Sequence, residues 1–526
     1  MEFTNDLKQA LTCLDKTIYV VEEEGRRQYV RRSGTGDFPV GEHVLALAPP
    51  CLPDRLGDPS FCRDHHLLYP CYAGSMAHGI ASEALVAAMG EAGMLGFFGS
   101  AGMSLEELEG VIRRLSGRMG TLPFGMNLIN SPGDTDWEQG AVDLFLKHGV
   151  TLIEASAYLM PTPALVKFRV KGLTRDACGN IVAPNRIIAK VSRVEVAKRM
   201  LAPPPAKMVE KLLNSGEISD DEARVAALIP LAQDITAEAD SGGHTDHRAA
   251  LPLLPSMLRL AADIQAERRY TSPPRVGLAG GMGTPAAVAA AFAMGAAYIV
   301  TGSINQACLE SGSSAKVREM LACAVQTDVA DAPAADMFEM GIKVQVLKKG
   351  TRFAERASRL YELYRLYGGI EDIPETQRAK IEETIFRKPL QDIWKETEQF
   401  FKTRNPRQLE RADKDPKYKM ALVFRWYLGH ASHWANAGTE DRTEDYQVWC
   451  GPSMGAFNDW TRDSFMEDPA RRSAPLAALN LLYGAALLLR VQTLRTQGVR
   501  IEVPAQFPPP VDTLPEFMVT TRKAFP

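Results

Sequence analysis

Eight short apolar runs, most of them followed by a helical pattern, constrain the fold of this chain more than any other feature. The runs span Leu68–Tyr72, Met94–Phe98, Phe124–Ile129, Thr151–Ala155, Arg186–Val191, Asp234–Ala239, Arg275–Ala279 and Ala297–Thr301. Each has the length and composition of a buried strand and ends in small or polar residues. Eight strands alternating with helices favour an α/β fold of the (β/α)8 barrel type over an open doubly wound sheet.

Helical patterns fall between these runs. We expect helices over residues 82–91, 105–115, 137–147, 165–170, 194–213, 251–266 and 284–294, the fifth interrupted by Pro203–Pro205. Ser104 followed by Glu107, and Thr284 followed by Pro285, are typical helix starts. The barrel is therefore expected to occupy residues 67–349.

The composition changes after Lys349, where charged helical patterns replace the strands. We expect an all-helical domain that would act as a lid over a substrate site or as a docking domain, including a strongly apolar helix at Ala474–Arg490. The N-terminal residues predict a small separate element with a hairpin at Ile18–Val30. The expected domain ranges are 1–66, 67–349, 350–497 and a C-terminal tail at 498–526, extended around Pro508–Pro510.

Composition excludes several classes of protein. Among 526 residues, 45% are apolar and 24% charged, and the net charge is −4, which gives no electrostatic signature for nucleic acid or anionic membranes. The eight cysteines include no C-x-x-C pair, and the irregular group of Cys and His between Cys51 and Cys71 favours structural roles over a metal site. We find no secretory signal, and the apolar stretches at residues 286–300 and 474–489 are shorter than a membrane span. The sequence indicates a cytoplasmic protein.

In a (β/α)8 barrel the active site forms at the C-terminal ends of the strands. After the first run, small residues around Gly74 and Met76 would let a flat ligand approach the backbone. The third run contains Asn127, whose amide both donates and accepts hydrogen bonds, and the fifth contains Lys190. Lys190 would place a positive charge beside an electron-rich ring; a lysine that extends from the barrel rim into solvent is the structural alternative.

The sixth run leads into Gly242, Gly243 and His244. Two glycines directly before a histidine predict a tight turn with free amides that would direct the imidazole into the barrel mouth. A histidine there can act as an acid or base, or donate a hydrogen bond to a carbonyl. His247 is a weaker candidate for the same role.

Glycine turns follow the last two runs, at Gly280-Gly281 and at Gly302-Ser303. Amides after strands seven and eight of a barrel commonly bind phosphate; two ordinary glycine turns are the alternative. The chain has neither a G-x-G-x-x-G fingerprint after a strand nor a Walker lysine motif. Their absence favours flavin mononucleotide (FMN) over a dinucleotide.

These segments resemble a known family. Met76, the run Ala92–Gly99, Phe124–Asn127, Ala237–His244 and the glycine turns are similar to the FMN barrels that include nitronate monooxygenases and flavin-dependent enoyl-acyl-carrier-protein reductases. Further runs are similar to the PfaD-type trans-acting enoyl reductases of polyketide and polyunsaturated fatty acid synthases. These runs are Ala332–Gly341, Leu347–Thr351, Leu360–Tyr364 and Trp449–Asn458.

The resemblance implies a reductase that binds FMN, takes hydride from NADPH and reduces an α,β-unsaturated thioester on an acyl carrier protein. It assigns flavin contacts to Met76, Asn127 and Lys190, and a backbone contact with the ring to Gly243. It assigns phosphate binding to Gly281, Gly302 and Ser303 and the active-site position to His244. The helical insertion at residues 194–231 leaves the shape of the substrate entrance open.

Two other functions remain open at this point: a nitronate monooxygenase-like flavin oxidase, and a non-catalytic subunit that binds carrier proteins and keeps the flavin barrel only as a scaffold. A homodimer is one option for the oligomeric state. An acidic carrier protein would require a locally basic surface, and cations of the helical domain are candidates: Arg352, Arg356, Arg359, Arg365, Arg378, Lys380, Arg387 and Lys388. A solvated helix face with interleaved glutamates is the favoured alternative for this set.

Overall fold

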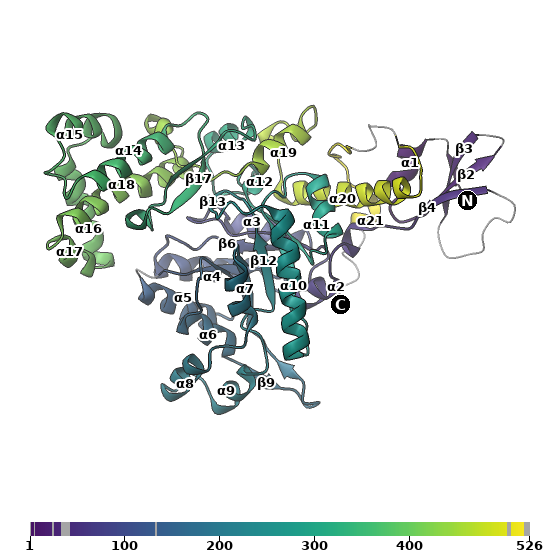
Figure 1. The fold of residues 1–526 in the computed structure, drawn as a ribbon, viewed down its shortest axis with the longest axis horizontal. Coiled ribbons are helices and arrows are strands. Elements are labelled where there is room, and N and C mark those ends of the chain that lie inside the picture. The colour runs from purple at the N-terminus through teal and green to yellow at the C-terminus, as the bar shows by residue number, and fades with distance from the viewer. Residues whose placement is uncertain are drawn as a thin grey trace. The chain divides into compact units, whose positions relative to one another are not determined.

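The computed structural model describes residues 2–4, 6–23, 26–32, 43–131, 134–501 and 507–519. Figure 1 shows the fold. Contacts within the fold divide the chain into two compact units. Unit 1 comprises Met1–Ala239, Arg248–Ser311 and Asp459–Pro526, and unit 2 comprises Asp240–His247 and Gly312–Asn458.

Unit 1 contains the predicted eight-stranded barrel. Eight parallel strands close in the order β11-β12-β14-β15-β5-β6-β7-β8. Their bounds are β5 (Cys71–Ala73), β6 (Leu95–Phe98), β7 (Gly125–Ile129), β8 (Leu152–Ser156), β11 (Arg186–Val191), β12 (Asp234–Glu238), β14 (Arg275–Ala279) and β15 (Ile299–Thr301). Nearly all of their residues are buried, as expected for strands covered on both faces. The predicted fold class is confirmed.

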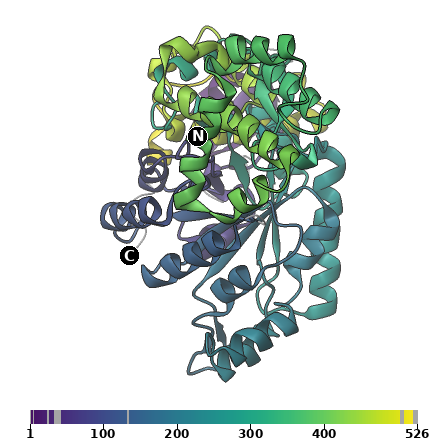
Figure 2. The ribbon, with the colours of Figure 1, turned by 90° about the vertical axis from the view of Figure 1, so that its left-hand side faces the viewer.

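The barrel helices also lie where the sequence predicts them. They are α3 (Glu83–Glu91), α4 (Leu105–Met119), α5 (Thr135–Lys147), α6 (Pro163–Val170), α7 (Val194–Leu201), α8 (Ala206–Asn214), α9 (Asp220–Ala226), α10 (Ala250–Arg268) and α11 (Pro285–Ala293). Ser104 and Glu107 form a reciprocal capping box at the start of α4. The expected interruption at Pro203–Pro205 separates α7 from α8. Figures 1 and 2 show these helices around the strands.

Polar side chains occupy parts of the barrel interior. At the N-terminal ends of the strands, buried Asp234 accepts a hydrogen bond from Arg275 at 2.6 Å and lies 2.8 Å from His65 of α2 (Pro59–His65). Higher in the barrel, the hydroxyl of Thr236 lies 2.8 Å from that of Tyr72 and 3.0 Å from that of Tyr298. The ion pairs and hydrogen bonds at the strand starts lie away from the end of a barrel that carries chemistry, so they serve stability.

The N-terminal part of unit 1 is a four-stranded antiparallel sheet with the order β1-β3-β2-β4. The strands are β1 (Glu2–Thr4), β2 (Thr17–Glu23), β3 (Arg26–Arg32) and β4 (His43–Ala48), and α1 (Leu7–Thr12) follows β1. Strands β2 and β3 form the hairpin predicted over Ile18–Val30.

The apolar helix α20 (Ala474–Thr496) belongs to unit 1 and packs on α11. A Cβ atom on Gly484 would lie 2.7 Å from Pro285, so the glycine permits this close approach. Helix α20 is the one described helix long and apolar enough to cross a membrane, and 72% of its most apolar window is buried within the protein. The tail packs nearby: Asn480 Oδ1 accepts a hydrogen bond from the Val511 amide, and α21 (Glu516–Val519) follows.

Unit 2 combines a small sheet with helices. The antiparallel sheet has the order β13-β17-β16, formed by β13 (Gly243–His244), β16 (Val329–Pro333) and β17 (Lys343–Leu347). The larger helices are α13 (Ala315–Ala322), α14 (Phe353–Leu366), α15 (Glu375–Ile381), α16 (Leu390–Arg404), α17 (Arg407–Ala412), α18 (Pro416–Ala437) and α19 (Ser453–Thr461). The core includes Phe338, Phe353 and Phe424.

These units differ from the domain ranges expected at 67–349, 350–497 and 498–526. Strands β16 and β17 pair with each other and with β13 rather than with the barrel, so unit 2 starts before residue 350. Residues beyond 458 belong to unit 1, because helix α20 packs on α11. Both differences arise from long-range pairing, which local composition does not report.

Candidate active site

The loop after β5 carries Gly74, Ser75 and Met76 at the C-terminal end of the barrel. The Gly74 amide donates to the Thr301 carbonyl at 2.9 Å, which ties this loop to the end of β15. A Cβ atom on Gly74 would lie 3.1 Å from Val300, so a larger residue would crowd the strand end. Met76 is half-buried beside these small residues. The loop is fixed and presents little side-chain bulk, as predicted for contact with a flat ligand.

A buried carboxylate, Glu154 of β8, anchors the same loop. It is 0% exposed and accepts a hydrogen bond from the Ser75 amide at 3.1 Å, from the Ser75 hydroxyl and from the Tyr72 hydroxyl at 3.1 Å. Three donors satisfy a charge that would otherwise be costly to bury. Asn127 lies on the neighbouring β7, where its Nδ2 donates to the Glu154 carbonyl at 3.1 Å and to Ser156.

Lys190 lies near the end of β11, with its Nζ 3.3 Å from Glu238 Oε1 of β12. Burial opposes its charged form, but the carboxylates of Glu238 and Glu154 raise the pKa of Lys190 above its ordinary value. The ammonium therefore remains charged at neutral pH. This ammonium can donate a hydrogen bond to a ligand at the mouth of the barrel, although the two carboxylates balance its charge.

The two predicted phosphate turns follow adjacent strands, since β14 pairs with β15. Gly280 and Gly281 have φ values of 86° and 81°, in the left-handed region that favours glycine. A Cβ atom added to Gly281 or Gly302 would meet nothing within 4 Å, so both glycines border open space. Ser303 begins the short helix α12 (Ser303–Gln306) directly after Gly302. The arrangement leaves room for a phosphate beside backbone amides.

Gly242, Gly243 and His244 lie in unit 2. Gly243 (φ 82°) and His244 form strand β13, which pairs with Gln345 and Val344 of β17. A Cβ atom on Gly242 would lie 2.8 Å from the Cys450 amide nitrogen, and one on Gly451 would lie 2.8 Å from the Gly242 nitrogen. Glycine is thus required on both sides of this backbone crossing.

The imidazole of His244 has a carboxylate neighbour. Its Nε2 lies 3.1 Å from Asp336 Oδ1, and the two side chains are 41% and 50% exposed. Burial would raise the pKa of Asp336, but the contact with His244 lowers it below the ordinary value. The carboxylate is therefore charged and can orient the imidazole.

The weaker candidate, His247, has a different environment. Its two ring nitrogens lie 2.9 Å from Asp240 and 3.2 Å from Asp331. Gln345, which is buried, also donates to Asp240 at 2.7 Å. These contacts tie the segment before α10 to the sheet of unit 2, so the structure gives His247 a structural role.

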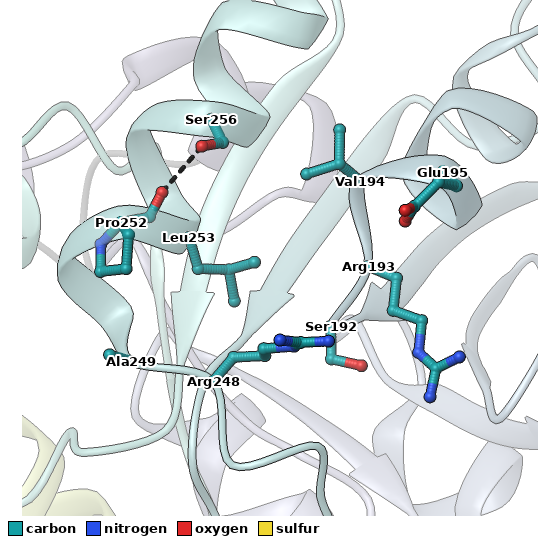
Figure 3. A pocket seen from close by; sticks show the side chains of 9 residues that line it. All are labelled: Ser192, Arg193, Val194, Glu195, Arg248, Ala249, Pro252, Leu253 and Ser256. Carbon is teal, nitrogen blue, oxygen red and sulfur yellow. Dashed lines mark hydrogen bonds between the residues drawn. The ribbon is translucent and has the colours of Figure 1, made fainter.

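A pocket of about 430 Å³ lies beyond the ends of β11 and β12 in unit 1 (Figure 3). The starts of α7 and α10 form its walls, including Ser192, Val194 and Leu253. In Figure 3 the Arg248 side chain extends from the start of α10 towards Ser192. Lys190 is two residues before Ser192, so this pocket opens at the same end of the barrel as the site.

The structure thus brings together, at one end of the unit 1 barrel, most of the residues that the sequence predicts. They are Gly74, Met76, Asn127, Lys190, Gly280, Gly281, Gly302 and Ser303. It assigns Gly242, Gly243 and His244 to unit 2. Sequence reasoning missed Glu154 and Glu238 as partners of the site. A single acidic residue inside the otherwise apolar run Thr151–Ala155 was the available signal for Glu154.

These residues fit FMN. The open space at Gly281 and Gly302 and the left-handed turn at Gly280-Gly281 would accommodate its phosphate. The fixed loop at Gly74 would allow a ring to lie against the backbone, and charged Lys190 would face it.

Comparison with known proteins identifies the family. Residues 60–351 match the model for nitronate monooxygenase. The chain belongs to the nitronate monooxygenase family. Residues 367–446, within unit 2, match a second model, the inserted helical domain of acyl-carrier-protein S-malonyltransferase.

Within this family the chain is similar to proteins of polyketide and polyunsaturated fatty acid synthesis. It is 44% identical, over 93% of its length, to a polyunsaturated fatty acid synthase polypeptide of Thraustochytrium sp., and 43% identical, over 86% of its length, to polyketide biosynthesis protein PksE of Bacillus subtilis. It spans only 33% and 59% of these relatives.

A solved structure matches most of this chain. The enoyl reductase domain of MlnA, from the macrolactin biosynthesis cluster of Bacillus amyloliquefaciens, superposes with a TM-score of 0.80 at 38% identity. The match covers 84% of this chain and 99% of that domain. The predicted resemblance to the PfaD-type enoyl reductases within this family is confirmed.

Proposed function

We propose that this chain is an FMN-dependent enoyl reductase that uses NADPH to reduce the α,β double bond of enoyl thioesters carried by an acyl carrier protein. The observation that carries the proposal is the match to 99% of the MlnA enoyl reductase domain. The names of the other relatives support a place in polyketide or polyunsaturated fatty acid synthesis. Action in trans on the synthase is part of the proposal.

The proposed FMN contacts are those of the candidate site. Gly280, Gly281, Gly302 and Ser303 would bind the phosphate, and Gly74, Met76, Asn127 and Lys190 would contact the ribityl chain and ring. The backbone of Gly242-Gly243 is proposed to approach the ring. The cofactor, when bound, supplies hydride transfer from NADPH to the β carbon of the thioester.

In the proposed reaction, the protein places a protonated lysine beside the ring and a hydrogen-bond or proton donor beside the thioester. Lys190 stays protonated beside two carboxylates and is proposed to donate a hydrogen bond to the ring. His244 is proposed to donate a hydrogen bond to the thioester carbonyl or a proton to the α carbon. Asp336, 3.1 Å from His244 Nε2, would hold the imidazole in orientation.

An anaerobic titration tests the whole proposal. NADPH should bleach the visible flavin absorbance of the purified protein, and a crotonyl thioester on a carrier protein should restore it. Bleaching without recovery would contradict the enoyl reductase and leave a flavoprotein with another acceptor. His244→Ala should retain flavin binding and bleaching but slow the recovery; full rates in both half-reactions would overturn the role of His244.

Two controls separate the alternative functions. Oxygen consumption with a nitroalkane, without a pyridine nucleotide, would indicate a nitronate monooxygenase activity instead. Absence of a flavin spectrum after FMN is added would support the scaffold function. Replacing NADPH by NADH in the same titration determines the preferred donor.

A further inference from the structure

Most of the helical-domain cations that the sequence offered as docking candidates are neutralised within unit 2, in line with the solvated helix face that was favoured for them. Arg356, which is buried, pairs with Asp445 and Glu444, and Arg387 also lies 3.4 Å from Asp445. Others pair with glutamates on or near their own helix: Arg352 with Glu355, Arg359 with Glu362, and Lys388 with Glu396. These five residues stabilise unit 2 and offer little net charge to a partner.

A different part of unit 2 carries uncompensated positive charge. From Arg404 to Lys419, across α17 and the start of α18, the sequence has six Lys and Arg against three Asp and Glu, although the whole chain is acidic. Five of these cations make no ion pair with any residue that the structure describes. They are Arg407, Arg411, Lys414, Lys417 and Lys419, here called the α17–α18 basic surface.

Aromatic rings hold three of these cations in place. The guanidinium of Arg411 lies 3.8 Å from the centre of the Tyr418 ring. The ammonium of Lys419 lies 4.7 Å from Trp394, and that of Lys417 lies 5.1 Å from Tyr364. A ring fixes the position of a cation without neutralising its charge. The positive surface is therefore preorganised, which lowers the entropy cost of docking.

The helices beneath this surface form a firm base. Ala412, Tyr418 and Leu422 pack with Trp394 and Phe401 into a small core shared by α16, α17 and α18. Phe400 of α16 remains 50% exposed. Arginine side chains and an exposed aromatic ring on a packed base are features that protein-binding surfaces share.

We propose that the α17–α18 basic surface docks the acidic carrier protein that presents the enoyl thioester. The inference rests on the proposed function and adds the surface that recognises the partner. Charge complementarity identifies the occupant: carrier proteins are small and acidic, and this surface is basic on an acidic chain. The surface also lies inside residues 367–446, the segment that matches an inserted domain from another acyl-carrier-protein enzyme family.

Charge reversal tests the proposal. Arg407→Glu with Lys414→Glu changes two exposed residues that contact no ring. The matched control is Arg365→Glu with Lys380→Glu, which changes the net charge equally at two other exposed unit 2 cations with no described ion pair. Each protein is assayed with crotonyl thioesters of a holo acyl carrier protein and of pantetheine.

The first variant should raise KM for the carrier-bound thioester by about fivefold to tenfold and leave the pantetheine thioester unaffected. The control should leave both unchanged. Equal KM for wild type and variant on the carrier-bound substrate would overturn the proposal, as would an equal loss on both substrates or the same loss in the control.

Direct binding separates this proposal from the proposed function. Fluorescence anisotropy with a labelled holo carrier protein at low ionic strength needs no catalysis. Binding by wild type that weakens in the Arg407/Lys414 variant supports docking even if neither thioester is reduced, in which case only the reductase proposal fails. If wild type does not bind the carrier protein, the docking surface is wrong even if the pantetheine thioester is reduced.

Discussion

At the scale of single residues, the buried carboxylate of Glu154 connects the structure of the barrel with its chemistry. It accepts hydrogen bonds from the loop that carries Gly74 and Met76, and its charge contributes to the raised pKa of Lys190. Glu154 would affect a bound ligand indirectly, through the Ser75 loop and Lys190. We therefore treat Glu154 as a positioning residue.

Glu154→Gln keeps the shape of the side chain and removes its charge. We expect the affinity of the apoprotein for FMN to fall about tenfold, because the Ser75 loop and Lys190 lose a charged partner. Flavin fluorescence quenching measures the affinity. Glu138→Gln is the matched control: Glu138 is also buried and accepts from the Tyr158 hydroxyl at 2.7 Å, but it lies on α5. Equal losses in both variants would contradict the positioning role.

Gly302 offers a second test of the site. Its φ of −136° lies outside the left-handed region, and a Cβ atom would enter open space. Gly302→Val should block the proposed phosphate position and abolish FMN binding, and far-UV circular dichroism checks that the variant still folds. Gly117→Val, on α4, also enters open space and should bind FMN normally. Normal FMN affinity in Gly302→Val would remove Gly302 from the site.

At the scale of elements, the starts of the barrel strands hold a buried charged cluster whose stability depends on pH. Burial lowers the pKa of His65 below its ordinary value of 6.5, although contact with Asp234 opposes this shift. His65 therefore stays neutral in the folded state at a pH where the unfolded chain takes up a proton. Stability from this group is present above the unfolded pKa and is lost as the pH falls below it.

We expect the free energy of unfolding to decrease between pH 7 and pH 5, with a contribution from His65 of up to about 1.4 kcal/mol per pH unit. Urea unfolding at several pH values measures the slope. His65→Gln removes the titrating group, so its slope should be smaller even if the variant is less stable throughout. The same slope in both proteins would contradict the assignment.

Elements differ in how well the sequence predicts them. The eight barrel strands and the start of α4 follow from local signals, because buried runs end in glycine or polar residues and Ser104 caps its own helix. Strand β13 has two residues, and it is a strand only because β17 pairs with it a hundred residues later. Local patterns contain no information about such pairing.

The residues of the candidate site also fall into two groups, those with a local sequence signal and those without one. Glycines and His244 are visible in the sequence because they follow predicted strands. Glu154 and Asp336 are not, because their relevance depends on which loop or ring they contact in three dimensions. The proposed docking surface could not be found from the sequence either, because only the ion pairs in the structure distinguish Arg359, which pairs with Glu362, from Arg407.

At the scale of the whole molecule, the proposed cofactor should contribute to folding stability. A ligand that binds only the folded state at 100 times its Kd stabilises by about 2.7 kcal/mol. Removing FMN should therefore lower the thermal unfolding temperature, and adding it back should restore the temperature. The unfolding temperature of Gly302→Val should be the same with and without added FMN. No difference between the FMN-free and the FMN-loaded wild type would contradict FMN as the resident cofactor.

The division into units has a consequence for recombination between relatives. The chain passes between unit 1 and unit 2 at four points, after residues 239, 247, 311 and 458. A gene segment encoding residues 312–458 alone would lack Gly243-His244, which form the outer strand of the unit 2 sheet. In the resulting chimera, Gln345 and Gly451 would pack against residues of the recipient protein instead of their own partners. Exchange of the proposed carrier-protein preference between related enzymes therefore requires residues 240–247 and 312–458 to be transferred together, and chimeras that transfer only one of the two segments should misfold.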